Sequence, residues 1–173
     1  MGMRKGLGAG VVSDILRSYR APRAVLRHRI GPAVDEGGAL ITLVLACGLI
    51  FVAQWPRLSR EAYEQGKDLD MMVGGALMAW VFIMPLVLYA LAALLHVVLR
   101  LVGGKQSAYE VRMATFWALL AAAPLWLLYG LCVGFLGVTP AVTAVGFIGF
   151  AAYVVFWALG LIEVAFAKGQ PDV

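Results

Sequence analysis

A continuous uncharged stretch at residues 71–99 constrains this chain more than any other feature of its sequence. Its twenty-nine residues include no Asp, Glu, Lys or Arg, and Arg100 follows directly. A helix rises about 1.5 Å per residue and needs roughly 20 apolar residues to cross a hydrocarbon core of about 30 Å. The stretch is therefore long enough to span a bilayer with some tilt, and too short for two full crossings, which would need roughly 40 apolar residues.

The composition extends this conclusion to the whole chain. Apolar residues make up 62% of it and charged residues 14%, with a mean hydropathy of +0.88, which excludes an ordinary soluble domain. The apolar stretches predict four spans, at residues 39–55, 71–99, 113–136 and 140–162. We therefore expect an all-α, polytopic transmembrane bundle over residues 39–162, between a basic segment at 1–38 and a short tail at 163–173.

The N-terminal segment combines positive charge with a helical pattern of apolar residues. It holds seven Lys and Arg against three acidic residues, and apolar side chains recur at helical spacing on both sides of Pro22. The pattern predicts short amphipathic helices in the cytoplasmic headgroup layer, and a partly ordered soluble tail is the alternative. Because the segment leads into apolar sequence, we expect anionic lipid as its partner and not nucleic acid. The lipid-headgroup candidates are Arg17, Arg20, Arg23, Arg27 and Arg29.

The distribution of Lys and Arg predicts the orientation of the bundle. With four spans, the N-terminal segment, the second linker and the C-terminal tail share one side, which holds eleven of the fourteen basic residues. The positive-inside rule places this side in the cytoplasm. Both termini are therefore expected to be cytoplasmic.

Two prolines and a glycine turn predict breaks in helix geometry. Pro85 and Pro124 each remove a backbone hydrogen bond near mid-membrane and predict a helix kink. Gly103, Gly104 and Lys105 lie between the second and third spans, where glycines suit the end of a helix and a tight turn.

Pairs of small residues predict close contacts between helices. Gly130 and Gly134 have the spacing that lets transmembrane helices approach closely, and Gly75 with Ala79 forms a weaker pair. Such pairs serve either contacts within one bundle or a contact to a second chain. We therefore expect self-association or a membrane-protein partner. No residue pattern in the sequence identifies that partner.

The predicted spans hold no recognisable pattern for chemistry. His96 is their only His, Asp, Glu, Lys or Arg, and it lies one turn before Arg100. It is either a proton-sensitive or ligand-contacting site, or a histidine that makes an ordinary hydrogen bond at headgroup level. The sequence contains no metal-binding spacing, phosphate loop or nucleophile motif. We expect no catalytic, cofactor-binding or metal-binding residues and no enzymatic activity.

The order of these features resembles that of the Yip1-domain membrane proteins. The shared marks are the basic segment with a proline at residues 20–23, the Gly-Gly-Lys turn at 103–107, a following helix with an internal proline, and an aromatic final span. The resemblance covers about residues 13–165 and implies a helical bundle, usually of five spans, with a cytoplasmic N-terminus. Eukaryotic members act with small GTPases in vesicle traffic, but this chain lacks their long polar N-terminal region. It is more similar to bacterial members, which implies the bacterial inner membrane.

Three classes of function are compatible with these features. The favoured class is a non-enzymatic membrane protein that organises the membrane or serves a membrane complex through helix packing and lipid or protein contacts. The second is a small transporter or transporter subunit that uses the broken helices at Pro85 and Pro124. The third, an enzyme acting on lipids, would depend on the linker residues Asp68, Asp70, Glu110 and Arg112.

Overall fold

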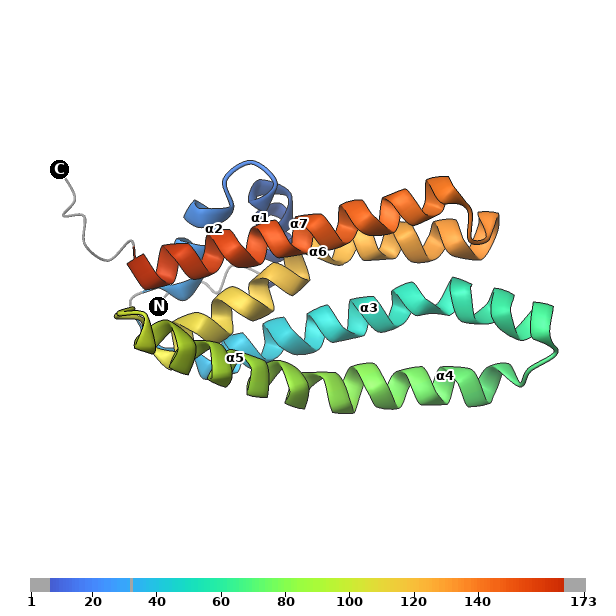
Figure 1. Cartoon of the computed structure of the whole chain (residues 1–173), viewed down its shortest axis with the longest axis horizontal. Helices are drawn as coiled ribbons and strands as arrows, with labels where there is room; N and C mark the ends of the chain where they lie inside the picture. Colours follow the sequence, from blue (N-terminus) through green and yellow to red (C-terminus); the bar gives the residue numbers. More distant parts are fainter. Residues whose placement is uncertain (1–6, 32, 167–173) are drawn as a thin grey trace.

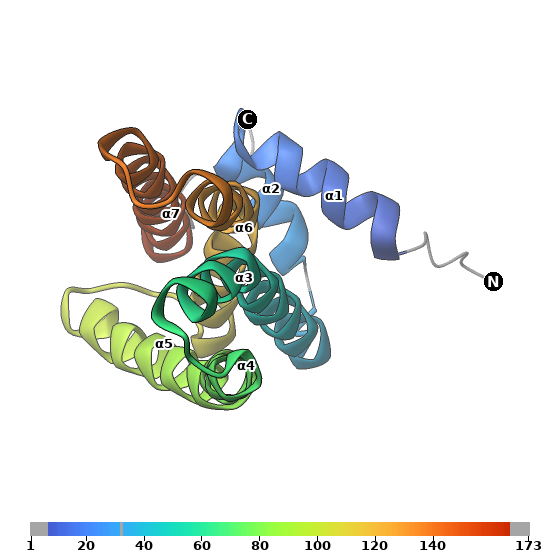
Figure 2. The ribbon, with the colours of Figure 1, turned by 90° about the vertical axis from the view of Figure 1, so that its right-hand side faces the viewer.

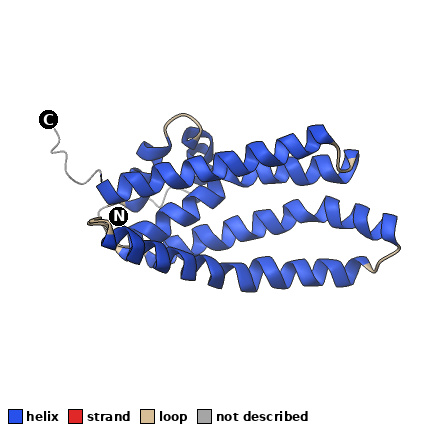
Figure 3. Ribbon diagram, viewed as in Figure 1, coloured by secondary structure: helices blue, strands red, loops and turns tan. Residues whose placement is uncertain are grey.

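The computed structural model describes residues 7–31 and 33–166, which form helices joined by short turns (Figure 1), with no strand among these residues (Figure 3). Two short helices, α1 (Leu7–Ser18) and α2 (Pro22–Ile30), come first. The long helical segments that follow are α3 (Glu36–Gln65), α4 (Leu69–Leu77), η1 (Met78–Ile83), α5 (Met84–Leu101), α6 (Ala108–Leu136) and α7 (Pro140–Phe166).

Four helical rods in the described part of the chain are long and apolar enough to cross a membrane. They are α3, the continuous rod α4–η1–α5, α6 and α7. The expected all-α bundle with four spans is therefore confirmed. The helices extend beyond the predicted apolar stretches, because polar residues that flank these stretches are also helical.

The clearest extension follows Pro56, which lies inside α3 and does not end it. The helix continues to Gln65 and ends where Gly66 adopts a left-handed conformation, with φ of 62°. Arg60 and Glu64 form an ion pair one turn apart in this polar extension. A proline removes one backbone hydrogen bond, which the rest of a long helix tolerates. The linker expected from residue 56 to residue 70 is reduced to residues 66–68.

A π-helix, η1, lies just before Pro85, where the sequence predicts a helix kink. The six residues of η1 lie directly before Met84, whose N–H bonds to the carbonyl of Ala79, five residues back. In a regular α-helix, a proline ring clashes with the carbonyl four residues earlier. The wider π turn gives the ring room within a continuous rod.

α6 is the central helix of the bundle. Between Tyr109 and Ala123 every residue except Arg112 is buried, and α1, α2, α3, α5 and α7 all contact this helix. Figure 2 shows α6 between α7 and α2, with α3 beneath it. Pro124 lies inside α6, and the helix changes direction between its yellow first half and its orange second half (Figure 1). By contrast, α4, α5 and α7 expose much of their apolar surface, as helices in contact with lipid do.

One end of the bundle, which we call the basic end, holds the start of α3, the α5–α6 turn and the last turn of α7 (Figure 1). The α3–α4 and α6–α7 turns lie at the opposite end. Helices α1 and α2 pack beside α6 and α7 in the half nearer the basic end. The predicted boundary at residue 163 falls inside α7, and the tail beyond Phe166 lies outside the described residues.

Candidate functional site

Helices α1 and α2 bind to the bundle through one face. Ile15 and Ser18 of α1 and Val25 and Leu26 of α2 are buried. Gly160 of α7 allows this approach, because a Cβ built on it would lie 3.1 Å from Cδ2 of Leu26. One side of α1 and α2, which the sequence predicts to lie in the headgroup layer, therefore contacts the bundle.

Two hydrogen bonds join the end of α1 to α6. The indole N–H of Trp117 donates to Oγ of Ser18 at 3.1 Å, and the hydroxyl of Tyr19 donates to the carbonyl of Ala121 at 3.0 Å. Ala121 lies in the turn before Pro124, where a proline disturbs the backbone hydrogen bonding of a helix. The Tyr19 ring also packs edge-on against Phe156 of α7, with centroids 5.2 Å apart. Tyr19 therefore links α1 to both α6 and α7.

Two of the five lipid-headgroup candidates make ion pairs within the chain. Arg27 of α2 pairs with Glu163 of α7, whose carboxylate is only 8% exposed, through two N–H groups, with 2.9 Å from Nε to Oε1. Arg29 binds Asp14 of α1 through Nε and Nη2, at 2.8 and 2.7 Å, and its guanidinium lies 4.7 Å from the ring centroid of Trp117. These arginines hold the helix pair together and attach it to the bundle.

The other three candidates are exposed. Arg17, Arg20 and Arg23 make no ion pair or side-chain hydrogen bond with any residue that the structure describes. The five arginines of this segment thus divide into two that attach it to the protein and three whose charges remain available.

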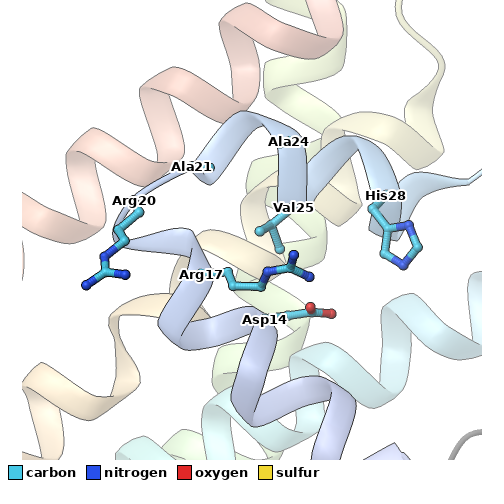
Figure 4. Close-up of a pocket in the computed structure, with 7 residues that line it drawn as sticks. All are labelled: Asp14, Arg17, Arg20, Ala21, Ala24, Val25 and His28. Carbon is cyan, nitrogen blue, oxygen red and sulfur yellow. The ribbon is translucent and has the colours of Figure 1, made fainter.

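A groove of about 360 Å³ lies between α1 and α2, and two of the three exposed arginines, Arg17 and Arg20, line it. Figure 4 shows Arg17 extending into the space between the two helices, with Arg20 at one end and His28 at the other. The pairing with Arg29 compensates the negative charge of Asp14, so the lining is net positive. The groove is lined by Asp14, Arg17, Arg20, Ala21, Ala24, Val25 and His28.

The outer side of α1 is apolar. Val12 is 60% exposed and Leu16 is 67% exposed, and they lie one helical turn apart. A hollow lined by Leu16, Arg17, Tyr19 and Arg20 adjoins the groove through the two shared arginines. Cationic and apolar surface are therefore contiguous at this place.

The two predicted small-residue pairs lie in different surroundings. A Cβ on Gly130 would overlap the carbonyl group of Ala53, and one on Gly134 would overlap Pro56, so both glycines lie where α6 crosses α3 closely. Gly75 has nothing within 4 Å of the position of a Cβ, and Ala79 is half-buried. Any close packing through Gly75 requires a second chain.

The turn predicted at residues 103–105 joins α5 to α6. Gly103 has a φ of 91°, the N–H of Gly104 bonds to the carbonyl of Leu99 at 2.8 Å, and Lys105 is exposed. Gln106 is buried and donates to the carbonyl of His96 at 3.4 Å. Nδ1 of His96 has no hydrogen-bond partner among the described residues.

The linker residues considered for lipid chemistry take part in helix capping and pairing. Asp68 accepts a hydrogen bond from the N–H of Asp70 at 2.9 Å. Glu110 forms a reciprocal capping box with Ser107 at the start of α6, and Arg112 pairs with Glu36 of α3. Across residues 7–31 and 33–166, no group of three or more His, Cys, Asp or Glu is placed to hold a metal ion.

Sequence reasoning did not identify the contacts that Ser18, Tyr19, Trp117 and Glu163 make. Glu163 carried the strongest signal, because it is an acidic residue at the edge of an apolar span, where a buried carboxylate needs a cationic partner. Nothing in the sequence identified that partner, since Arg27 lies 136 positions away.

The fold and the basic helix pair together define a multi-pass, helical-bundle protein of the membrane. A family model for the Yip1 domain matches residues 16–170, which include α2 and the four long rods. The chain belongs to the Yip1-domain family, and the resemblance drawn from its sequence is confirmed. The comparison with curated proteins found no match, and the comparison with solved structures found none.

Proposed function

We propose that this Yip1-domain protein is a non-enzymatic component of a bacterial inner membrane that binds the anionic cytoplasmic leaflet through α1 and α2. Through this contact and its helix-packing surfaces it organises the membrane or serves as an accessory subunit of a membrane complex. The observation that carries the proposal is the set of three exposed arginines, Arg17, Arg20 and Arg23, which find no partner in the described structure.

The energetics of such a contact are favourable. A Lys or Arg close to an anionic leaflet contributes about 1 kcal/mol, and the attraction falls off within a Debye length of about 8 Å at physiological salt. The segment that carries the three free arginines is already folded, so it loses little additional backbone entropy when it binds. Val12 and Leu16 add apolar surface beside these charges, which suits the boundary between headgroups and acyl chains.

The arrangement of the long rods supports cytoplasmic termini. The four rods alternate in direction, so the start of α3 and the last turn of α7 lie at the same, basic end (Figure 1). The segments attached at this end hold eleven of the fourteen Lys and Arg in the sequence. The positive-inside rule favours this end in the cytoplasm.

The test is hydrogen–deuterium exchange on the full chain in nanodiscs of phosphatidylcholine, with and without added phosphatidylglycerol. We expect the anionic lipid to slow exchange in α1 and α2 and added salt to reverse this protection. The double variant R17Q/R23Q should lose the protection. The control R57Q/K67Q removes the same charge from two exposed side chains near the opposite end and should retain it. Equal exchange with and without phosphatidylglycerol in the unmodified protein would contradict the proposal.

A further inference from the structure

We infer that the groove between α1 and α2 is a binding site for a single phosphate group, supplied by the headgroup of an anionic phospholipid. The inference rests on the proposed contact with the leaflet and narrows it from a charged surface to one site. It depends on the side chains of the groove, on the first turn of α2 and on the apolar surface of α1 that adjoins both.

The side chains make the groove a site for an anion. Arg17 extends into it and Arg20 lies at its edge, and neither has a partner in the part of the chain that is described (Figure 4). Asp14, the one acidic side chain in the lining, accepts a hydrogen bond from Nε of Arg29 and forms an ion pair with Nη2 of the same residue. A guanidinium group binds phosphate oxygens in a bidentate manner, so Arg17 can make charge-assisted hydrogen bonds to a phosphate in the groove.

The first turn of α2 adds backbone donors. The first N–H groups of a helix have no acceptor within the helix, and a side-chain cap usually satisfies one of them. Here the cap residue is Ala21, which makes no side-chain hydrogen bond, and Pro22 follows at the first helical position. Ala21 and Ala24 both line the groove, so this uncapped turn and its dipole add to the positive potential of the two arginines.

The apolar surface next to the groove favours a lipid over free phosphate. The adjoining hollow shares Arg17 and Arg20 with the groove and adds Leu16 and Tyr19. Leu16 is 67% exposed and makes this side apolar. A phospholipid can place its phosphate between α1 and α2 and its glycerol and first methylene groups against Leu16, whereas inorganic phosphate uses only the groove.

A titration of the full chain in neutral detergent with short-chain phosphatidylglycerol tests the inference, with the stoichiometry read by native mass spectrometry. We expect saturable binding of one lipid per chain. Arg17→Gln should weaken it about tenfold, because a charge-assisted hydrogen bond is lost. Arg57→Gln makes the same change of net charge on an exposed residue near the opposite end of the bundle, and should weaken binding less than about twofold. Equal losses of phosphatidylglycerol affinity in the two variants would overturn the inference of a single site.

Ala24→Phe tests the groove without a change of charge. The larger side chain should fill the groove and abolish saturable binding, whereas Ala24→Ser should preserve it. Hydrogen–deuterium exchange in α2 shows whether each variant keeps its fold. If A24F does not fold, the comparison of R17Q with R57Q tests the single site. Retained one-to-one binding in a folded A24F protein would also overturn the inference.

Inorganic phosphate and short-chain phosphatidylcholine identify the source of the phosphate group. Inorganic phosphate should compete with phosphatidylglycerol only weakly, and zwitterionic phosphatidylcholine should bind more weakly than phosphatidylglycerol. Inorganic phosphate that binds as tightly as the lipid would overturn the assignment to a headgroup. If phosphatidylglycerol protects α1 and α2 in nanodiscs but shows no saturable binding, the leaflet contact stands and the single site fails.

Discussion

Glu163 shows how one residue can attach a peripheral segment to a membrane bundle. Its carboxylate is nearly buried at the end of α7, and Arg27 supplies the opposite charge from α2. A buried ion pair contributes little net stability, but removal of one partner leaves an uncompensated charge. The two partners are therefore not equivalent, because Arg27 is mostly exposed and Glu163 is not.

This asymmetry predicts unequal effects of two substitutions. Arg27→Ala should lower the free energy of unfolding by about 2 kcal/mol, because it leaves the Glu163 carboxylate buried and unpaired. Glu163→Gln should cost about 1 kcal/mol, since the amide oxygen still accepts a hydrogen bond. Thermal or denaturant unfolding in detergent measures both values. In the double variant R27A/E163Q much of the cost of R27A should disappear, and additive costs would contradict the explanation.

Tyr19 allows a similar test at the kink of α6. Partial burial raises the pKa of Tyr19, so its hydroxyl remains a hydrogen-bond donor at neutral pH. Tyr19→Phe should cost about 1 kcal/mol, because it removes the hydrogen bond to Ala121 and keeps the ring against Phe156. Hydrogen–deuterium exchange should rise in α1 and in the turn of α6 before Pro124. Faster exchange in α1 alone would show that Tyr19 does not stabilise the kink.

At the scale of elements, the contact between α3 and α6 depends on glycine. Gly130→Leu should lower the free energy of unfolding by about 1–3 kcal/mol, because the new side chain must displace the backbone at Ala53. Gly75→Leu is the matched control, since Gly75 faces open space, and should change stability by less than about 0.5 kcal/mol. Unfolding in detergent compares the two variants, and equal costs would mean that Gly75 also packs against a protein surface.

The same elements show which features a sequence can reveal. Four spans were predictable because bilayer thickness sets the length of an apolar helix. The extension of α3 past Pro56 was not, because hydropathy reports where apolar residues end and not where a helix ends. The docking of α1 and α2 was also not predictable, since Arg17 and Arg27 look alike in an amphipathic pattern. Only the folded chain, which places Glu163 beside Arg27, shows that Arg27 attaches the segment and that Arg17 remains free.

At the scale of the whole molecule, the central helix and the helix pair form one connected structure. α6 contacts the other three long rods, reaching the α4–η1–α5 rod through α5, and also contacts α1 and α2. Tyr19 and Trp117, which form the hydrogen bonds between the end of α1 and α6, therefore connect the surface proposed to bind lipid with the centre of the bundle. The three arginines proposed to bind lipid lie in the same half of the molecule as the basic end, so one orientation satisfies both the leaflet contact and the distribution of charge.

The expected orientation, with the basic end in the cytoplasm, can be tested with reporter fusions. If four rods cross the membrane and the basic end is cytoplasmic, an alkaline phosphatase reporter fused to the C-terminus should be inactive, because this enzyme folds only in the oxidising periplasm. The same reporter inserted in the α3–α4 turn, after Gly66, should be active. Green fluorescent protein at the C-terminus is the converse control and should fluoresce. An active reporter at the C-terminus would mean an odd number of crossings or an inverted bundle, and in an inverted bundle Arg17, Arg20 and Arg23 would face the wrong leaflet.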